Sequence, residues 1–232
     1  MDLHTHTIAS GHAYGTIREN AQAAADRKLQ ILGITEHGPG IPGTCDEFYF
    51  CNLRSIPRVL NGVEVYFGVE ANVDNDGNIL LNERWLKRLD YAIVGIHSFT
   101  FENRGREENT DALIKTMQHP KVHIISHPDD DHMPLNYERL VKAAKENHVA
   151  LELNNSSLHK PQSRLNCYDN YRMMLKLAMD YGTYIVVDSD AHDPSAVGNF
   201  DLAIPLLEEV GFDESLLTNN DPQKFYELIS SK

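Results

Sequence analysis

Histidine is the residue type in this sequence with the greatest capacity for chemistry, with 12 copies among 232 residues. His4 and His6 flank a single threonine, and Asp190 and His192 flank a single alanine. Residues i and i+2 of an extended segment point to the same side, so each pair can offer two ligands to one metal ion. Imidazole and carboxylate ligands without thiolates favour a catalytic site for zinc, manganese or iron over a closed structural zinc site.

Further candidate ligands recur at intervals of about one strand plus one helix. Polar residues at positions 4, 37, 70, 97, 127, 154 and 190 follow one another at this spacing. The full set of candidate metal ligands is His4, His6, His12, His37, Glu70, His97, His127, Asp190 and His192. Nine ligands are too many for one ion and generous for two. Three ions with three or four ligands each, and one shared carboxylate, account for all of them.

The segments between these residues predict strands that alternate with helices. Short runs rich in Val and Ile, typical of strands buried on both faces, cover residues 1–3, 31–35, 63–69, 91–96, 122–126, 149–153 and 184–188. Helical patterns cover residues 16–28, 82–89, 109–118, 137–147, 167–181, 194–210 and 222–230. The first begins with a capping box of Thr16 and Glu19, and Gly182 is placed to end the fifth. Residues 38–50 are expected to form a long irregular loop.

This alternation predicts an α/β fold made of parallel β-α units. Each predicted strand ends in a polar residue, so the arrangement of the strands decides whether these residues meet. The outer strands of an open sheet would be too far apart to share one site, whereas the carboxyl ends of barrel strands converge on one mouth. We therefore expect a (β/α)7 TIM-like barrel. Because the chain has no linker and no low-complexity tract, we expect one domain over residues 1–232.

The charge balance excludes several classes of partner. The formal net charge is −13, from 21 Lys and Arg against 34 Asp and Glu, which disfavours nucleic acid and anionic membranes. No apolar run reaches the length of a membrane span, and the first residues do not resemble a signal peptide, so we expect a cytoplasmic protein. Cys45, Cys51 and Cys167 lack metal-binding spacing and are odd in number, which predicts free thiols.

Five motifs resemble those of the PHP (polymerase and histidinol phosphatase) family, above all its small stand-alone phosphatases. They are Asp2-Leu3-His4-Thr5-His6-Thr7, Ile34-Thr35-Glu36-His37-Gly38, Gly68-Val69-Glu70-Ala71-Asn72, Ile125-Ser126-His127-Pro128 and Asp188-Ser189-Asp190-Ala191-His192. The resemblance spans nearly the whole chain. It implies a distorted seven-stranded barrel and three divalent ions, usually zinc, with manganese or iron as alternatives. It also implies phosphoesterase activity on a small phosphorylated substrate.

The resemblance further implies which residues bind which ion. The first ion would take His4, His6, Glu70 and Asp190, the second Glu70, His97 and His127, and the third His12, His37 and His192. Glu70 would then bridge two ions and be central to catalysis. Ions bound in this way activate water for attack on phosphorus and neutralise the phosphate oxygens.

Two segments are candidates for binding the substrate. Arg54 and Arg58 would share a face of a helix, and a guanidinium group offers phosphate a planar fork of donors. The resemblance favours Arg54 in particular as a catalytic phosphate clamp. Asn154, Asn155 and Ser156 follow the one predicted strand that has no metal ligand at its end, which makes them candidate substrate contacts.

Two acidic features depart from the family pattern. Glu36 stands where the family often has Asp. The sequence identifies no general acid for the leaving group: Glu36 is one candidate, and a metal-held water is the alternative. The run Asp129-Asp130-Asp131 directly follows the His127 motif and would repel a phosphate at the mouth. We therefore expect this run to form a solvated loop that is turned outward.

Three other functions remain open. Amidohydrolases also begin with His-x-His on a barrel strand, but they have eight strands and commonly a lysine that bridges their metals, where this chain has Glu70. A PHP-type nuclease is disfavoured by the net charge of −13. Metal storage is disfavoured by the open coordination positions of the expected site. The resemblance allows a homo-oligomer, although the sequence contains no clear interface signal.

Overall fold

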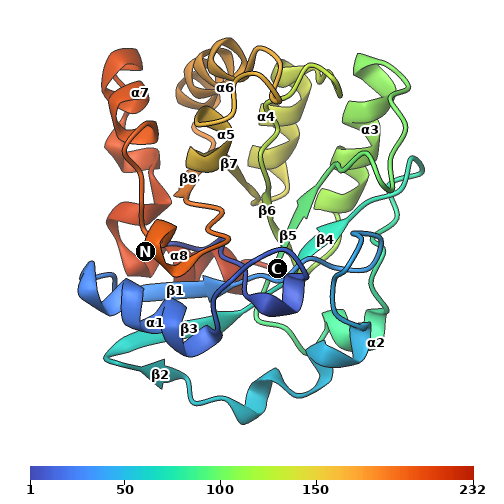
Figure 1. Cartoon of the computed structure of the whole chain (residues 1–232). Coiled ribbons are helices and arrows are strands. Elements are labelled where there is room, and N and C mark those ends of the chain that lie inside the picture. The colour runs from blue at the N-terminus through green and yellow to red at the C-terminus, as the bar shows by residue number, and fades with distance from the viewer.

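The strands of the protein form two sheets, as seen in a computed structural model that describes residues 1–232 (Figure 1). The strands are β1 (Ile31–Ile34), β2 (Val59–Leu60), β3 (Val63–Phe67), β4 (Glu70–Asn72), β5 (Ala92–Gly95), β6 (Val122–Ile125), β7 (Ala150–Asn154) and β8 (Ile185–Asp188). One sheet has the order β1-β3-β2 and the other the order β4-β5-β6-β7-β8. Only β2 runs antiparallel to its neighbour.

Six of the seven segments predicted as strands are strands in the structure. The predicted strand at residues 63–69 is divided into β3 and β4 around Gly68, where a Cβ atom would come within 3.0 Å of the Tyr91 carbonyl oxygen. Residues 1–3 form no regular strand. They approach β1 through one parallel bridge, between Asp2 and Leu32.

Isolated parallel bridges connect the two sheets. Thr5 pairs with Ala191 just beyond β8, and His37 pairs with Glu70 at the start of β4. Together with the bridge between Asp2 and Leu32, these pairs place residues 2–5 between β1 and the segment that follows β8. The molecule therefore has an α/β fold dominated by parallel strands, as predicted.

Helices cover the outside of the strands. They are α1 (Ile17–Asp26), α2 (Glu83–Leu86), α3 (Arg106–Met117), α4 (Tyr137–Glu146), α5 (Asn155–Leu158), α6 (Cys167–Tyr181), α7 (Ala203–Val210) and α8 (Pro222–Ser230). The capping box of Thr16 and Glu19 is present at α1, and Gly182 ends α6 with a φ of 67°. The predicted helix at residues 194–210 begins only at Ala203, because Gly198 takes a positive φ of 70° after a single 3-10 turn. No helix has the combination of length and apolar character needed to cross a membrane.

The core has two parts because alternate strand residues face opposite sides. Leu32 belongs to a large cluster between the strands and the surrounding helices, whereas its neighbour Ile31 belongs to a smaller cluster. Phe225 and Leu228 of α8 pack into that smaller cluster. Within it, the hydroxyl of Tyr91, just before β5, donates a hydrogen bond to the Leu3 carbonyl oxygen at 2.5 Å. Apolar side chains therefore fill the space near the amino ends of the strands, and polar residues are left for the carboxyl ends.

Candidate metal centre

Seven of the nine predicted metal ligands line one cavity of about 410 Å³ at the carboxyl ends of the strands. The other two, His4 and His6, have no exposed surface. No apolar side chain lines this cavity. The lining residues are His12, His37, Glu70, His97, His127, Ser156, Ser157, Lys160, Arg164, Asp190 and His192. We refer to this space as the metal cavity.

Glu70 occupies the centre of the histidines. Its Oε2 atom lies 2.7 Å from His37 Nδ1 and 3.4 Å from His4 Nε2. Its Oε1 atom lies 2.7 Å from His127 Nε2 and 3.3 Å from His97 Nε2. Both carboxylate oxygens thus face imidazole nitrogens from separate segments, which is the arrangement required of a carboxylate shared between two ions.

His4, His6 and Asp190 form a compact group, with their ligand atoms within 4.8 Å of one another. The Nε2 atoms of His4 and His6 are 3.0 Å apart, and His6 Nε2 is 3.3 Å from Asp190 Oδ1. The two histidines come from the segment that follows the bridge at Asp2, and Asp190 comes from the turn after β8. The i and i+2 spacing of the two histidines therefore converges on one point, as predicted from the sequence.

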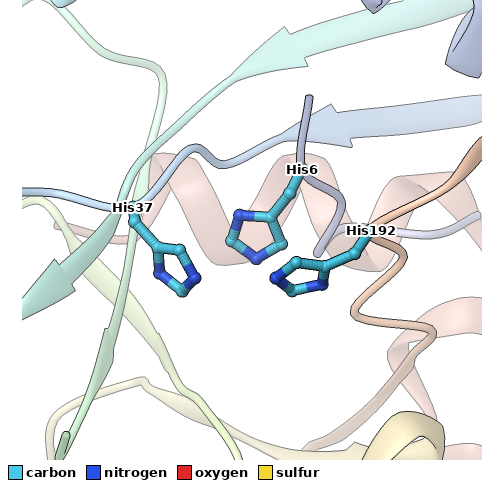
Figure 2. Close-up of side chains that lie close together, drawn as sticks. All are labelled: His6, His37 and His192. Atoms are coloured by element: carbon cyan, nitrogen blue, oxygen red, sulfur yellow. The ribbon is translucent and has the colours of Figure 1, made fainter. Parts of the chain in front are cut away.

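His12, His37 and His192 surround the outer part of the metal cavity. The Nε2 atoms of His12 and His192 are 3.1 Å apart, and the ring centroids of His12 and His37 are 4.9 Å apart. His6 also lies close to this set: Figure 2 shows His6, His37 and His192 near one another on three separate segments, and their ligand atoms lie within 4.8 Å. His6 therefore borders two of the three expected ion sites.

Unpaired buried atoms show that these residues fit divalent ions. Three atoms of the centre are buried without a hydrogen-bond partner: Glu70 Oε2, His37 Nδ1 and His97 Nδ1. The first two are 2.7 Å apart, but they are not aligned for a hydrogen bond with each other. Buried polar atoms are normally paired. An unpaired set made only of imidazole and carboxylate atoms suits zinc, manganese or iron.

Two buried glutamates hold the histidine rings from behind. His4 Nδ1 is 2.6 Å from Glu152 Oε1, and His6 Nδ1 is 2.9 Å from the Ser10 hydroxyl, which donates to Glu36 Oε2 at 2.6 Å. Such contacts leave Nε2 of each ring free to face a metal. The interpretation of Glu36 as a general acid is wrong, because its carboxylate is fully buried beneath this hydrogen bond. Sequence reasoning assigned no role to Glu152, although a charged residue inside an apolar strand was an available signal.

The electrostatics of the centre match this arrangement. Burial by itself would raise the pKa of Glu70, but the nearby imidazoles of His4 and His37 hold that pKa well below its usual value. Burial opposes the ionisation of Asp190 in the same way, and His4 and His6 keep its pKa well below normal. Burial lowers the pKa of His6 well below normal. Burial opposes the protonation of His4, but Glu152 and Glu70 hold its pKa well above normal, so a metal bound there would displace a proton from this ring. Glu70 and Asp190 are thus kept ionised and His6 is kept neutral, which are the forms that bind metals.

Two of the predicted ligands have strained backbones. His127 has a φ of 29° and Asp190 has a φ of 51°, a region that residues with a side chain rarely adopt. Strain of this kind costs about 1–3 kcal/mol per residue and persists only where the surroundings hold it in place. Its occurrence at the ends of β6 and β8 turns both side chains toward Glu70 and His6.

The predicted phosphate clamp of Arg54 and Arg58 is wrong. Arg58 donates hydrogen bonds at 2.6 and 3.0 Å to the carboxylate of Asp90, which precedes β5, and Arg54 donates to the carbonyl oxygen of Arg88. Both partners lie before the amino end of β5, whereas His97 follows its carboxyl end. The shared helical face does not form either, because only one 3-10 turn is present in this segment.

The two predicted asparagine contacts are occupied by the protein itself. Asn154 has no exposed surface, and its Nδ2 atom lies 3.2 Å from both Glu152 Oε2 and Asp190 Oδ2. The amide of Asn155 holds the chain at the start of α7, where its Oδ1 accepts from the backbone N–H of Ala203 at 2.9 Å. Of the three predicted contacts, only Ser156 lines the metal cavity, and Asn155 lines a second cavity beside it.

Sequence reasoning missed Lys160 and Arg164, which both line the metal cavity. Arg164 donates to Asp129 Oδ1 at 2.6 Å and to the His127 carbonyl oxygen at 3.1 Å. Asp129 is fully buried, so the expectation of an outward acidic run is wrong at this position: the carboxylate neutralises an arginine at the mouth. Two basic residues in the loop between α5 and α6 were the available signal.

Comparisons with known proteins agree with this geometry. A family model described as the PHP domain matches residues 2–156. The chain is 41% identical over 234 residues to a "Probable phosphatase" of Thermoanaerobacter sp. (strain X514), with 100% of this chain and 95% of the relative covered. It is 43% identical over 234 residues to another "Probable phosphatase", from Caldanaerobacter subterraneus subsp. tengcongensis, with 100% and 91% covered.

A solved structure has a similar fold. It is the histidinol phosphate phosphatase of Lactococcus lactis subsp. lactis complexed with zinc, L-histidinol and phosphate, which matches with a TM-score of 0.63 at 16% identity. The match covers 91% of this chain and 94% of that one. With the family model matched over residues 2–156 and relatives at about 40% identity along the full length, the chain belongs to the PHP family.

Proposed function

We propose that the protein is a metal-dependent phosphatase that hydrolyses small phosphate monoesters at a centre of three divalent ions. The convergence of nine imidazole and carboxylate side chains around Glu70, at the mouth of a polar cavity, carries this proposal. The names of the full-length relatives support the enzyme class. The zinc bound in the related fold supports zinc as the metal.

The proposed ligand sets follow the family pattern. The first ion would take His4, His6, Glu70 and Asp190, the second Glu70, His97 and His127, and the third His12, His37 and His192. Ions bound here would supply Lewis-acid activation of water and would neutralise phosphate charge. Glu70 contributes a negative charge shared between the first two sets, and its depressed pKa keeps that charge in place over the physiological pH range.

Lys160 and Arg164 are the proposed phosphate-binding side chains. Both line the metal cavity, in which Glu70 and Asp190 are the only carboxylates. Asp129 holds the guanidinium of Arg164 by a buried ion pair at 2.6 Å, so that its remaining donors are oriented before substrate arrives. Ser156, whose hydroxyl accepts from Lys160 Nζ at 2.8 Å, completes this wall.

The leaving group has space beside the ions. A second cavity of about 310 Å³ shares Ser156, Lys160, Asp190 and His192 with the metal cavity. The exposed ring of Tyr14 forms part of its other wall. This size admits a small organic group and not a folded macromolecule, which supports a small phosphorylated substrate.

We also propose that both sheets belong to one distorted seven-stranded barrel, which makes residues 1–232 one domain. The bridges from Asp2 to Leu32 and from Thr5 to Ala191 support this closure, because they join residues 2–5 to β1 of one sheet and to the segment just beyond β8 of the other. The bridge between His37 and Glu70 supports it on the other side. Closure places every strand end at one mouth.

Metal analysis combined with substrate assays tests the function. We expect the purified protein to contain three divalent ions and to hydrolyse p-nitrophenyl phosphate, and we expect a chelator to abolish turnover until zinc or manganese is restored. An amide panel and single-stranded DNA serve as alternative substrates. Preferential hydrolysis of either would favour an amidohydrolase or a nuclease, and absence of bound metal would exclude the proposal.

A further inference from the structure

β7 is the one strand of the five-stranded sheet that has none of the nine proposed ligands in it or just after it, yet it has a buried carboxylate in its middle. Alternate residues of a strand face the same side, so Ala150, Glu152 and Asn154 share one face of β7. Ala150 packs in the small apolar cluster with Ile124 and Val186. Glu152 therefore lies directly between that apolar layer and the metal cavity, with no exposed surface.

The carboxylate of Glu152 contacts ligands from two different ion sets. Its Oε1 atom is 2.6 Å from His4 Nδ1, and its Oε2 atom accepts the backbone N–H of His127 at 2.6 Å. Oε2 also lies 3.2 Å from Asn154 Nδ2, and that amide nitrogen is itself 3.2 Å from Asp190 Oδ2. One side chain is thus joined to His4, to His127 and, through Asn154, to Asp190.

Each contact has a defined effect on a ligand. The contact with His4 fixes a proton on Nδ1 and holds the ring so that Nε2 faces Glu70 and Asp190. The contact with His127 holds a residue whose φ of 29° is strained, and that backbone directs its ring toward Glu70. Loss of the carboxylate therefore frees one ring to rotate and one backbone to relax.

We infer that Glu152 is a positioning residue that holds the first and second ion sites together and does not act on the third. His12, His37 and His192 make no hydrogen bond or ion pair with it, and the third set is supported from other segments. The inference rests on the metal centre of the proposed function but not on the phosphatase reaction. Metal binding, and not turnover, is therefore the readout.

The test is the number of zinc ions retained after dialysis at a fixed free zinc concentration that just fills the wild-type protein. The amide of a Glu152→Gln variant can accept a hydrogen bond at only one of the two positions, and outer-shell losses of this kind weaken metal binding by about 10–100-fold. We expect three ions in the wild type and one in E152Q. Circular dichroism checks that the variant is folded, and if E152Q does not fold, Glu152→Asp replaces it with the same expectation.

Glu36→Gln is the matched control, because Glu36 is equally buried and reaches no ligand of the second set: through Ser10 it contacts only the ring of His6 and the backbone N–H of His37. We expect E36Q to retain the second ion. Wild-type zinc content in E152Q, loss of the third ion along with the others, or loss of the second ion in E36Q would overturn the inference. A wild-type protein that binds no zinc would instead contradict the proposed function.

Discussion

At the scale of single residues, the orientation of each side chain decides its part in the centre more than its type does. Glu70 and Glu152 are both fully buried glutamates, but Glu70 faces five imidazole nitrogens and Glu152 accepts from the far side of one ring. The first arrangement suits a bridging ligand, and the second suits a carboxylate that positions a ligand. Arg164 and Arg58 differ in the same way, because each is paired with an aspartate but only Arg164 lines the metal cavity.

Glu70→Gln is predicted to remove the shared negative charge between the first two ions. We expect metal content to fall from three ions to one, and kcat/KM for p-nitrophenyl phosphate to fall by at least about 100-fold, since outer-shell changes alone cost about 10–100-fold. Plasma mass spectrometry and steady-state kinetics measure the two effects. Glu83→Gln, the same change at an exposed glutamate paired with Lys87, is the control and should behave as wild type. Full turnover in E70Q would exclude a bridging role.

Lys160→Met is predicted to weaken the binding of phosphate while leaving metal content unchanged. Hydrogen bonds to charged groups contribute about 1.5–3 kcal/mol, so the inhibition constant for inorganic phosphate should rise by about tenfold or more. Competitive inhibition assays measure this constant. Lys142→Met on the exposed face of α4 and Arg58→Met before β3 are matched changes away from the cavity. If all three variants bind phosphate equally well, Lys160 has no role in the site.

At the scale of elements, each strand has one part that supports the fold and another that serves the site. β6 shows this division clearly, because His127 follows its carboxyl end while His123 lies near its amino end. Pairing with β5 shifts in register there, from Ala92 opposite Val122 to Ile93 opposite Ile124, which makes His123 the extra residue of a bulge. Its ring is buried and both ring nitrogens lack a hydrogen-bond partner.

The environment of His123 predicts a loss of stability in acid. Burial, followed by the charge of Lys232, lowers the pKa of His123 to about 4, whereas an unfolded histidine titrates near 6.5. Below about pH 6.5 the unfolded chain therefore binds a proton that the native protein excludes, and the free energy of unfolding falls until about pH 4. The total loss is roughly 3 kcal/mol.

Urea unfolding at several pH values, with a chelator present, measures this contribution as the difference between wild type and His123→Leu. The variant should lose less stability than the wild type between pH 6.5 and 4, because the buried imidazole is absent. His132→Leu, a change at an exposed histidine, should retain the wild-type dependence. Identical pH profiles for wild type and H123L would contradict the prediction.

At the scale of the whole molecule, charge is separated between surface and site. The chain has a formal charge of −13. The metal cavity, in contrast, is lined by five imidazoles, one ammonium group and one guanidinium group, and by only two carboxylates. Three divalent ions would change the formal total from −13 to about −7 and would place all of the added charge at the mouth. The field should then favour small phosphates in the cavity and repel long polyanions from the surface.

Single-stranded DNA is accordingly predicted to be neither a substrate nor a competitor. We expect an oligonucleotide to leave the hydrolysis of p-nitrophenyl phosphate unchanged. The concentration of its phosphate groups should match a concentration of inorganic phosphate that inhibits the enzyme. Lower salt should strengthen this exclusion, because surface charges are then less screened. Inhibition assays at two ionic strengths check the expectation. Inhibition by DNA that grows stronger at low salt would contradict it and would favour a nuclease.

Local patterns in the sequence predicted much of the fold and of the ligand set. The strands, the capping box of α1 and the bounds of α6 depend on neighbouring residues, so they could be recognised without tertiary contacts. The ligands could be recognised because the chain returns to the same end of the strands once in every β-α unit. His4 and His6 on one segment, and Glu70 among histidines of other segments, lie together as this reasoning requires.

The contacts around those ligands depended on tertiary structure alone. Glu152 supports His4 across 148 positions of sequence, and Asp129 is buried because Arg164, 35 positions later, neutralises it. Arg54 and Arg58 had suitable chemistry, but their side chains make hydrogen bonds to residues just before the amino end of β5, away from the cavity. The sequence by itself determined which residues could bind metal, since spacing along a strand is a local property. Only the packing of distant segments decided which charges support the centre, because burial and pairing of a charge depend on the groups that surround it.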